Sequence, residues 1–279
     1  MKYLNDGTMN ISMLGLGTTG FWSGPHEGVS QCIREARDRY GINLFDTAEM
    51  YGNGRCESEL GHTLEGYERS QLFLVNKIHP DHATPKDFSR CLEESLIRLG
   101  TDYFDLYLLH WREKTELSFL VPAMQEAVRQ GKIRHWGVSN FDTQDLEDLM
   151  EAGGSDCWCN QIFYTLYERG AEYELRPYMN AHGILPMSYS SLGSGYCPHP
   201  DIRKNREIMD ACGAFGIAPE AMMLRMNNEY GFAALFSTSS IDHLHADLAE
   251  VSDEAYRSLR PVFDRAFPSP DHRWPLVKI

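Results

Sequence analysis

Short hydrophobic segments alternate along the chain with longer stretches in which hydrophobic residues recur every three or four positions. The short segments have the composition of buried strands, and the longer stretches have the periodicity of amphipathic helices. The predicted strands are 11–16, 43–46, 72–77, 104–110, 135–139, 158–161, 185–189 and 233–236. The predicted helices between them are 29–40, 57–64, 87–99, 122–130, 143–151, 174–182 and 203–215. Eight strands alternating with helices predict an α/β fold, a closed (β/α)8 TIM barrel.

Both ends of the chain extend this barrel. Asn5-Asp6-Gly7 between short hydrophobic pieces predicts an N-terminal β-hairpin. The C-terminal tail, residues 264–279, is rich in proline and aromatic residues, and its pattern leaves open whether it folds over the barrel mouth or covers the side. No stretch rich in proline and glycine divides the chain, so we expect one barrel domain over residues 1–279.

An alternative fold has to be weighed, because Gly15, Gly17 and Gly20 match the G-x-G-x-x-G pattern of dinucleotide-binding Rossmann units. In such a unit the third glycine opens a helix that holds a pyrophosphate. Here Gly24-Pro25 follows shortly afterwards, which indicates a loop instead of a first helical turn. The glycines are therefore expected to shape the loop that leaves the first barrel strand.

Charge and cysteine content exclude several classes of protein. Lys and Arg total 26 against 40 Asp and Glu, a net charge of −14 that disfavours binding to nucleic acid or an anionic membrane surface. No hydrophobic run approaches the ~20 residues that cross a bilayer, and the N-terminus lacks the hydrophobic stretch of a signal peptide. The seven scattered cysteines are typical of a reducing compartment. We expect a cytoplasmic protein; nothing in the pattern indicates its oligomeric state.

Polar residues stand where the predicted hydrophobic strands end. In chain order they are Asp46, Lys77, His110, Ser139 with Asn140, Gln161, Tyr189 and Ser237. In a TIM barrel the carboxyl ends of the strands meet at one face, and catalytic residues gather there. The pattern therefore predicts an active site built from these side chains.

Tyr51 lies shortly after Asp46, and together with Lys77 it indicates acid chemistry. A free tyrosine has a pKa of about 10, and a neighbouring cation lowers that pKa by stabilising the phenolate. Asp46 would keep Lys77 charged and oriented, and His110 would hydrogen-bond the substrate oxygen. Two other interpretations stay open at this point: a purely structural Asp46–Lys77 ion pair, and a strand-end histidine without a catalytic role.

Several motifs together resemble the aldo-keto reductase family over essentially the whole chain. Residues 45–52 (FDTAEMYG) resemble the first family signature and residues 137–141 (GVSNF) the second. Residues 74–77, 105–111 and 160–161 follow in the family's order and spacing. Residues 47–52, 109–112 and 266–268 resemble those of bacterial methylglyoxal-reductase-like members.

The resemblance implies a catalytic tetrad and a nicotinamide cofactor, NADPH or NADH. Tyr51 would be the general acid, with Asp46, Lys77 and His110 completing the tetrad. The implied cofactor contacts are Ser139, Asn140 and Gln161 to the carboxamide, Tyr189 stacked on the nicotinamide ring, Ser190, Leu192 and Ser194 beside the pyrophosphate, and Gly17 and Thr18 in the loop after the first strand. Trp22 and Trp111 would wall the pocket of a small aldehyde, ketone or dicarbonyl, although packing alone also accounts for them.

The chain departs from the family where NADPH-dependent members hold the 2′-phosphate and adenine. Phe236 and Ser237 replace a Pro-Lys pair, His243 replaces an Arg, and Asp247 replaces an Asn. The 2′-phosphate would lose its bidentate Arg partner and be repelled by the new carboxylate. The donors left near this position are Ser237, Thr238 and Ser239 at a helix start. We therefore expect weakened discrimination in favour of NADPH, with a preference for NADH as the limit.

Two other functions remain as alternatives. A Schiff-base aldolase or lyase would use Lys77 as its nucleophile but would not need Tyr51. A non-catalytic barrel that binds a nucleotide and senses redox state would keep the same residues without turnover.

Histidine clusters at His79 and His82 and at His243 and His245 raise the question of a metal. Neither has the helical i, i+4 spacing, and no further ligand is placed by the sequence to complete it. We expect loop and helix-start histidines and no metal.

Overall fold

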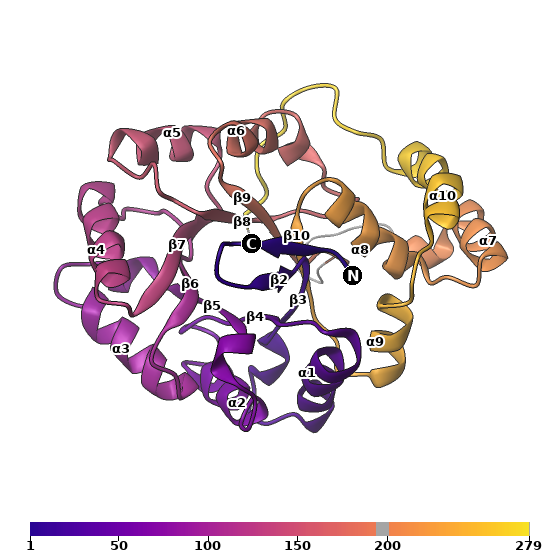
Figure 1. The fold of residues 1–279 in the computed structure, drawn as a ribbon. Helices are drawn as coiled ribbons and strands as arrows, with labels where there is room; N and C mark the ends of the chain where they lie inside the picture. Colours follow the sequence, from indigo (N-terminus) through magenta and orange to yellow (C-terminus); the bar gives the residue numbers. More distant parts are fainter. Residues whose placement is uncertain (194–200, 279) are drawn as a thin grey trace.

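The computed structural model describes residues 1–193 and 201–278 and contains a closed barrel of parallel strands (Figure 1). Around the barrel the strands follow the order β10, β3, β4, β5, β6, β7, β8, β9. Their bounds are β3 Leu14–Gly17, β4 Leu44–Asp46, β5 Phe73–Ile78, β6 Phe104–Leu109, β7 Ile133–Ser139, β8 Cys159–Phe163, β9 Leu185–Tyr189 and β10 Ala233–Phe236. Every neighbouring pair is parallel, which confirms the predicted (β/α)8 TIM barrel.

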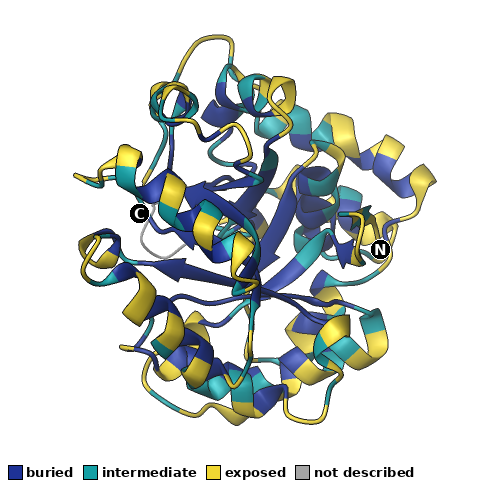
Figure 2. Cartoon of the chain, turned by 60° about the vertical axis from the view of Figure 1, so that its left-hand side comes forward, coloured by how far each residue is buried: buried dark blue, intermediate teal, exposed yellow. Residues whose placement is uncertain are grey.

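Helices surround the barrel; most bury one face against its strands, whereas those at 206–214 and 253–266 pack with the helix at 219–229 in a separate hydrophobic cluster. They are α1 Glu27–Tyr40, α2 Arg55–Thr63, α3 Phe88–Leu99, α4 Leu117–Arg129, α5 Thr143–Glu151, α6 Leu175–Ala181, α7 Arg206–Ala214, α8 Pro219–Glu229, α9 Ile241–Asp247 and α10 Asp253–Ala266. Figure 2 shows buried strands at the centre and helices that alternate between buried inner and exposed outer positions. Hydrophobic burial between strands and helices therefore holds the barrel together.

The predicted N-terminal hairpin is present as β1, Tyr3–Asn5, and β2, Asn10–Ser12. Gly7 at its turn has φ +93°, a left-handed conformation that glycine adopts readily. Ile11 packs into the hydrophobic cluster inside the barrel, and Asp6 pairs with His135 of β7 at 3.1 Å. The hairpin thus closes the N-terminal end of the barrel, opposite the ends where the strands carry their polar residues.

One predicted strand is wrong in its extent. Residues 11–16 form two elements, because β2 ends at Ser12 and barrel strand β3 begins at Leu14. The Ser12 hydroxyl accepts the N–H groups of Asn43 (3.1 Å) and Leu44 (3.3 Å) and donates to the carbonyl of Leu14 (2.8 Å). This side chain replaces ladder hydrogen bonds at the break, an effect that hydrophobic alternation does not reveal.

Other boundaries also differ from the prediction. Helices α8 and α10 were not predicted, and α10 extends to Ala266, so the irregular tail is shorter than residues 264–279. Strand β3 leads into a 3-10 turn at Thr19–Phe21, and α1 begins only at Glu27. The Rossmann alternative is therefore excluded by the closed barrel. A Cβ at Gly15 would lie 2.5 Å from Leu44 Cγ, so this glycine allows side chains of neighbouring strands to fill the barrel.

The six cysteines within residues 1–193 and 201–278 are all buried and free, in agreement with the prediction of unpaired thiols. Among the described residues, no helix has both the length and the apolar character needed to cross a membrane.

Candidate active site

A buried ion pair lies at the carboxyl ends of β4 and β5. Lys77 Nζ donates to Asp46 Oδ1 at 2.5 Å and to the carbonyl of Thr47 at 3.0 Å. The Lys77 side chain is 1% exposed and that of Asp46 5%. Burial lowers the pKa of Lys77, although the Asp46 carboxylate opposes the shift. The structure therefore brings together the two charges that the sequence placed at neighbouring strand ends.

Tyr51 reaches this pair from the loop after β4. Its backbone N–H donates to the carbonyl of Ala48 at 3.0 Å, so a tight turn directs the side chain back over the strand ends. The Tyr51 hydroxyl lies 3.5 Å from Lys77 Nζ. Burial, with the Asp46 charge, raises the pKa of Tyr51 well above its ordinary value. The shift is opposite to the expected lowering of the pKa, because burial and the Asp46 charge both favour the neutral phenol.

His110 completes the cluster from the end of β6. Its backbone N–H donates to the carbonyl of Ile78 at 3.0 Å, and its ring centroid lies 5.6 Å from that of Tyr51. Burial, together with the Lys77 charge, lowers the pKa of His110 well below its ordinary value, so the imidazole is neutral. Its Nδ1 is buried and has no hydrogen-bond partner among the described residues. A neutral ring beside Tyr51 fits a donor for a substrate oxygen.

Polar side chains of β7 and β8 connect to the same ion pair. Gln161 Nε2 donates to Asp46 Oδ2 at 2.8 Å, and Ser139 Oγ donates to the carbonyl of Gln161 at 2.8 Å. Asn140 has φ +61°, and its Nδ2 donates to the carbonyl of His110 at 3.1 Å. Tyr189 donates its hydroxyl hydrogen to Asn140 Oδ1 at 2.8 Å. The residues expected around the nicotinamide thus form one network with the tetrad.

A groove leads from Tyr51 to the loop after β10. A cavity of ≈ 130 Å³ is lined by Tyr51, Tyr189, Ser190, Leu192 and other residues. A second cavity, of ≈ 290 Å³, is lined by Thr238, Ser239 and other residues. The two cavities share Gly17, Thr19 and Ser237, and the neighbouring Thr18 Oγ1 is buried without a partner among the described residues. This extended groove with a spare polar atom fits an elongated dinucleotide.

Two expected cofactor residues lie outside these cavities. His243 is exposed in the first turn of α9, and Asp247, at the end of α9, is 9% exposed. Burial, reinforced by the charge of Glu220, raises the pKa of Asp247 to about 6. Ser194 lies outside the described residues.

Aromatic side chains stand beside the tetrad at its open side. The ring of Trp22 lies 6.0 Å from that of Tyr51, and the ring of Trp111 lies 4.8 Å from that of His110. Trp22 is 47% exposed, which leaves its ring available at the rim. The sequence analysis did not assign His79 to this wall, although its ring lies 4.7 Å from that of Trp111. In the sequence, the position of His79 two residues after Lys77, just beyond a strand end, indicated that it could lie on this wall.

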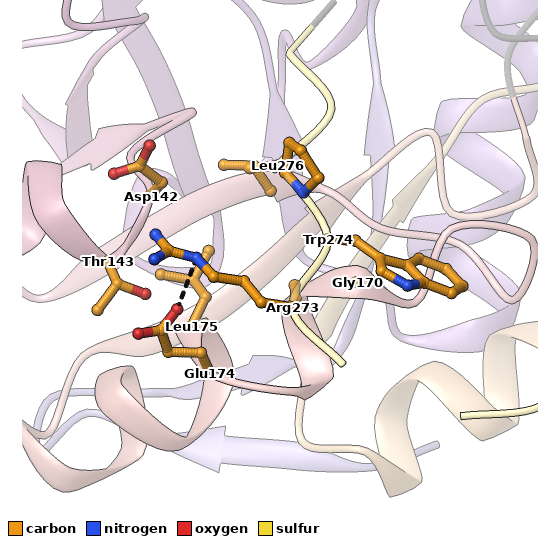
Figure 3. Close-up of a pocket in the computed structure, with 10 residues that line it drawn as sticks. Asp142, Thr143, Gly170, Glu174, Leu175, Arg273, Trp274 and Leu276 are labelled. Carbon is orange, nitrogen blue, oxygen red and sulfur yellow. Dashed lines mark ion pairs between the residues drawn. The ribbon is translucent and has the colours of Figure 1, made fainter. Parts of the chain in front are cut away.

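The C-terminal tail borders a pocket together with residues that follow β7 and β8 (Figure 3). Arg273 pairs with Glu174 at 3.0 Å, and Lys278 pairs with Asp145 at 3.0 Å. Trp274 stands against Gly170, beside a pocket of ≈ 340 Å³. These partners follow β7 and β8, so the tail lies on the catalytic face, one of the two positions that the sequence left open.

Comparisons with known proteins agree with this geometry. The profile described as "Aldo/keto reductase family" matches residues 13–214. Methylglyoxal reductase YeaE of Escherichia coli (strain K12) is 36% identical over 232 residues, covering 82% of this chain and 81% of the relative. The NADH-specific methylglyoxal reductase of the same organism is 30% identical over 226 residues, covering 70% and 68%.

A solved structure shares both the fold and the sequence. The aldo/keto reductase from Klebsiella pneumoniae in complex with NADP and acetate has a TM-score of 0.84 and 33% identity, covering 97% of this chain and 96% of that one. The chain therefore belongs to the aldo/keto reductase family, the NAD(P)H-dependent oxidoreductases that act on carbonyl groups.

Proposed function

We propose that this chain, acting as a single barrel domain, reduces small aldehydes, ketones or dicarbonyls to alcohols with Tyr51 as the proton donor. The observation that carries the proposal is the position of the Tyr51 hydroxyl, 3.5 Å from Lys77 Nζ at the head of the groove. Two relatives named as methylglyoxal reductases support a small dicarbonyl as the substrate class.

The tetrad residues divide the proton chemistry among them. When bound, reduced nicotinamide supplies the hydride that the carbonyl carbon accepts. Tyr51 gives its hydroxyl proton to the carbonyl oxygen, and the raised pKa keeps that proton in place until the oxygen gains charge. Lys77 then stabilises the phenolate, Asp46 holds Lys77 in position, and solvent returns the proton. Neutral His110 donates a hydrogen bond that orients the carbonyl oxygen.

The side chains at the far end of the groove support NADH as the better cofactor. Ser237, Thr238 and Ser239 offer hydroxyl groups there, and no Lys or Arg of the described residues lines the cavity. A 2′-phosphate would find hydroxyl groups instead of the Lys and Arg that hold it in NADPH-dependent members. The relatives are consistent with either cofactor, since one is named NADH-specific and a similar solved structure contains NADP.

Replacing Tyr51 by Phe tests the proton donor. We expect turnover of methylglyoxal to fall by about 10²–10⁴, the usual contribution of a positioned general acid. Binding of NADH, followed by tryptophan fluorescence, should be retained. Tyr256→Phe is the matched control, because the buried hydroxyl of Tyr256 has no partner among the described residues. Turnover by Tyr51→Phe within tenfold of the unmodified protein would exclude Tyr51 as the acid. Absence of turnover with every carbonyl tested would favour the non-catalytic alternative.

Fluorescence titration with NADH and NADPH side by side tests the cofactor preference. We expect the unmodified protein to bind NADH at least as tightly as NADPH. The variant Ser237→Lys should improve NADPH binding by about tenfold, since a charged hydrogen bond to the 2′-phosphate is restored. Its NADH affinity should change little, which serves as the internal control. Strong NADPH preference in the unmodified protein would contradict this proposal while leaving the reductase assignment intact.

A further inference from the structure

Three potential metal ligands converge beside the Tyr51 loop, on the outer side of the barrel wall. They are Glu49, two residues before Tyr51, His82 from the segment between β5 and α3, and Cys91 on α3. One ligand atom from each lies within 4.8 Å of the other two. The residues are far apart in the sequence, so the histidine pattern alone did not disclose the carboxylate and thiol that accompany His82.

The contacts within the group are those of a partly assembled site. Glu49 Oε1 lies 2.9 Å from His82 Nδ1 and accepts the backbone N–H of His79 at 2.6 Å. The Glu49 side chain is 6% exposed, and Cys91 is 2% exposed. The His82 ring is 46% exposed, so it provides the open side through which an ion would enter.

A second observation concerns Tyr107, on the strand that lies beneath α3. The Tyr107 hydroxyl is buried and has no hydrogen-bond partner among the described residues. Charges on Glu49 and Cys91 act on it, so it lies in the same buried region as the three-ligand group. An unpaired buried hydroxyl costs free energy unless an ion, a bound water or a ligand satisfies it.

We propose that Glu49, His82 and Cys91 form a site for a single divalent cation of the zinc type, with a water as the fourth ligand. Carboxylate, imidazole and thiolate are all ligands that zinc accepts. Ligand atoms around tetrahedral zinc lie about 3–4 Å apart, so the group needs movements of about 1 Å to close. Rotation of the exposed His82 ring supplies that movement.

The charges around the site balance a dication. The carboxylate of Glu49 and the thiolate of Cys91 together neutralise two positive charges. The nearby guanidinium groups are engaged elsewhere, since Arg98 pairs with Glu57 and Arg90 with Asp87. Cys91 binds a cation as the thiolate, so binding displaces the thiol proton.

An occupied site would connect three segments around the active site. Glu49 belongs to the loop that carries Tyr51, His82 follows the His79 that contacts Trp111, and Cys91 anchors α3. The cation would fix the substrate-side wall of the mouth relative to the helix layer. This role is independent of the reductase proposal, because it depends on ligand geometry and not on turnover.

Titration of the full chain with Co²⁺ as the probe, followed by Zn²⁺ displacement, tests the site. We expect one equivalent to bind with a thiolate-to-cobalt charge-transfer band, with release of about one proton at neutral pH. The band should disappear in Cys91→Ser and persist in the matched control Cys56→Ser. His82→Ala should weaken binding by about 100-fold, whereas the exposed control His62→Ala should not.

Several outcomes would overturn the proposal. They are a dissociation constant above about 100 µM, a cobalt complex without a thiolate band, or equal effects of the His82 and His62 variants. The group would then be a hydrogen-bonded cluster alone. Because His82 is at the surface, its variant remains decisive even where Cys91→Ser fails to fold.

Discussion

The two ends of the cofactor groove are built in different ways. At the catalytic end Asp46, Lys77 and His110 stand at strand ends inside the barrel wall, buried and joined to one another by hydrogen bonds and charge. At the adenosine end Ser237 and Ser239 are exposed in a loop, and His243 is exposed on the seven-residue helix α9. Under the proposed function the barrel would hold the catalytic groups and the exposed loop would select the cofactor, so we expect the two properties to change separately.

The largest effect is expected at the catalytic end, in Lys77→Met. This change leaves the Asp46 carboxylate buried without its cation, which should cost about 3–5 kcal/mol of unfolding free energy. Turnover should fall at least about 100-fold because the phenolate of Tyr51 loses its stabilising charge. Urea unfolding and steady-state kinetics measure the two effects.

The double variant Asp46→Asn/Lys77→Met separates structure from catalysis. Removing both charges should restore most of the stability but not the turnover. Recovered turnover in the double variant would show that the ion pair is structural only. The assignment of the catalytic chemistry to this end of the groove would then be wrong.

A smaller change in the free energy of unfolding, and a gain instead of a loss, is expected from Asp247→Asn on α9. Below pH 4 the carboxyl group is protonated in both folded and unfolded chains and contributes nothing. Between pH 4 and its folded pKa of about 6 the unfolded chain ionises first, so the unmodified protein loses stability relative to the variant. Above pH 6 we expect the variant to be more stable by about 1–2 kcal/mol, because the ionised carboxylate is buried in the folded chain.

Thermal unfolding at pH 4 and pH 8 measures this difference. Asp242→Asn on the exposed face of the same helix is the control and should show no such pH dependence. An Asp247→Asn variant that is less stable than the unmodified protein at pH 8 would mean that the carboxylate has a favourable partner and that burial does not raise its pKa.

The smallest effect on turnover is expected from Asp6→Ala, far from the groove. Asp6 Oδ1 accepts the N–H groups of Thr8 (2.7 Å) and Met9 (2.8 Å) and so fixes the hairpin turn. Its loss, together with that of the pair with His135, should cost about 2–3 kcal/mol of unfolding free energy, with kcat and KM unchanged. A marked fall in kcat would show that the closed end of the barrel influences catalysis after all.

The sequence predicted the barrel because each strand is a hydrophobic run that ends on a polar residue, as at Asp46 and Lys77. The same pattern grouped Asp46, Lys77 and His110 at one face with Tyr51 shortly after Asp46, whereas their roles as a tetrad came from the resemblance to the family. The break at Ser12 escaped prediction because a side chain, not a change of hydrophobic pattern, replaces the ladder hydrogen bonds. The direction of the Tyr51 pKa shift escaped it because burial depends on the complete three-dimensional packing.

The adenosine end shows where sequence reasoning stops. The replacements at Ser237 and His243 can be read directly, but their consequence depends on which side chains line the groove. The burial of Asp247 against α8 is a tertiary feature that no local pattern contains. Likewise, Glu49 and Cys91 meet His82 only because the barrel brings the β4 loop next to α3.

The opposite placement of the two termini has a practical consequence for protein engineering. The N-terminal hairpin closes the end of the barrel away from the tetrad, so a fused domain or affinity tag attached there would leave the mouth open. The C-terminal tail lies on the catalytic face, held by Arg273 and Lys278. A fusion at that end would disturb the segment that borders the substrate entrance. Tags and immobilisation linkers for this reductase are therefore best attached at the N-terminus.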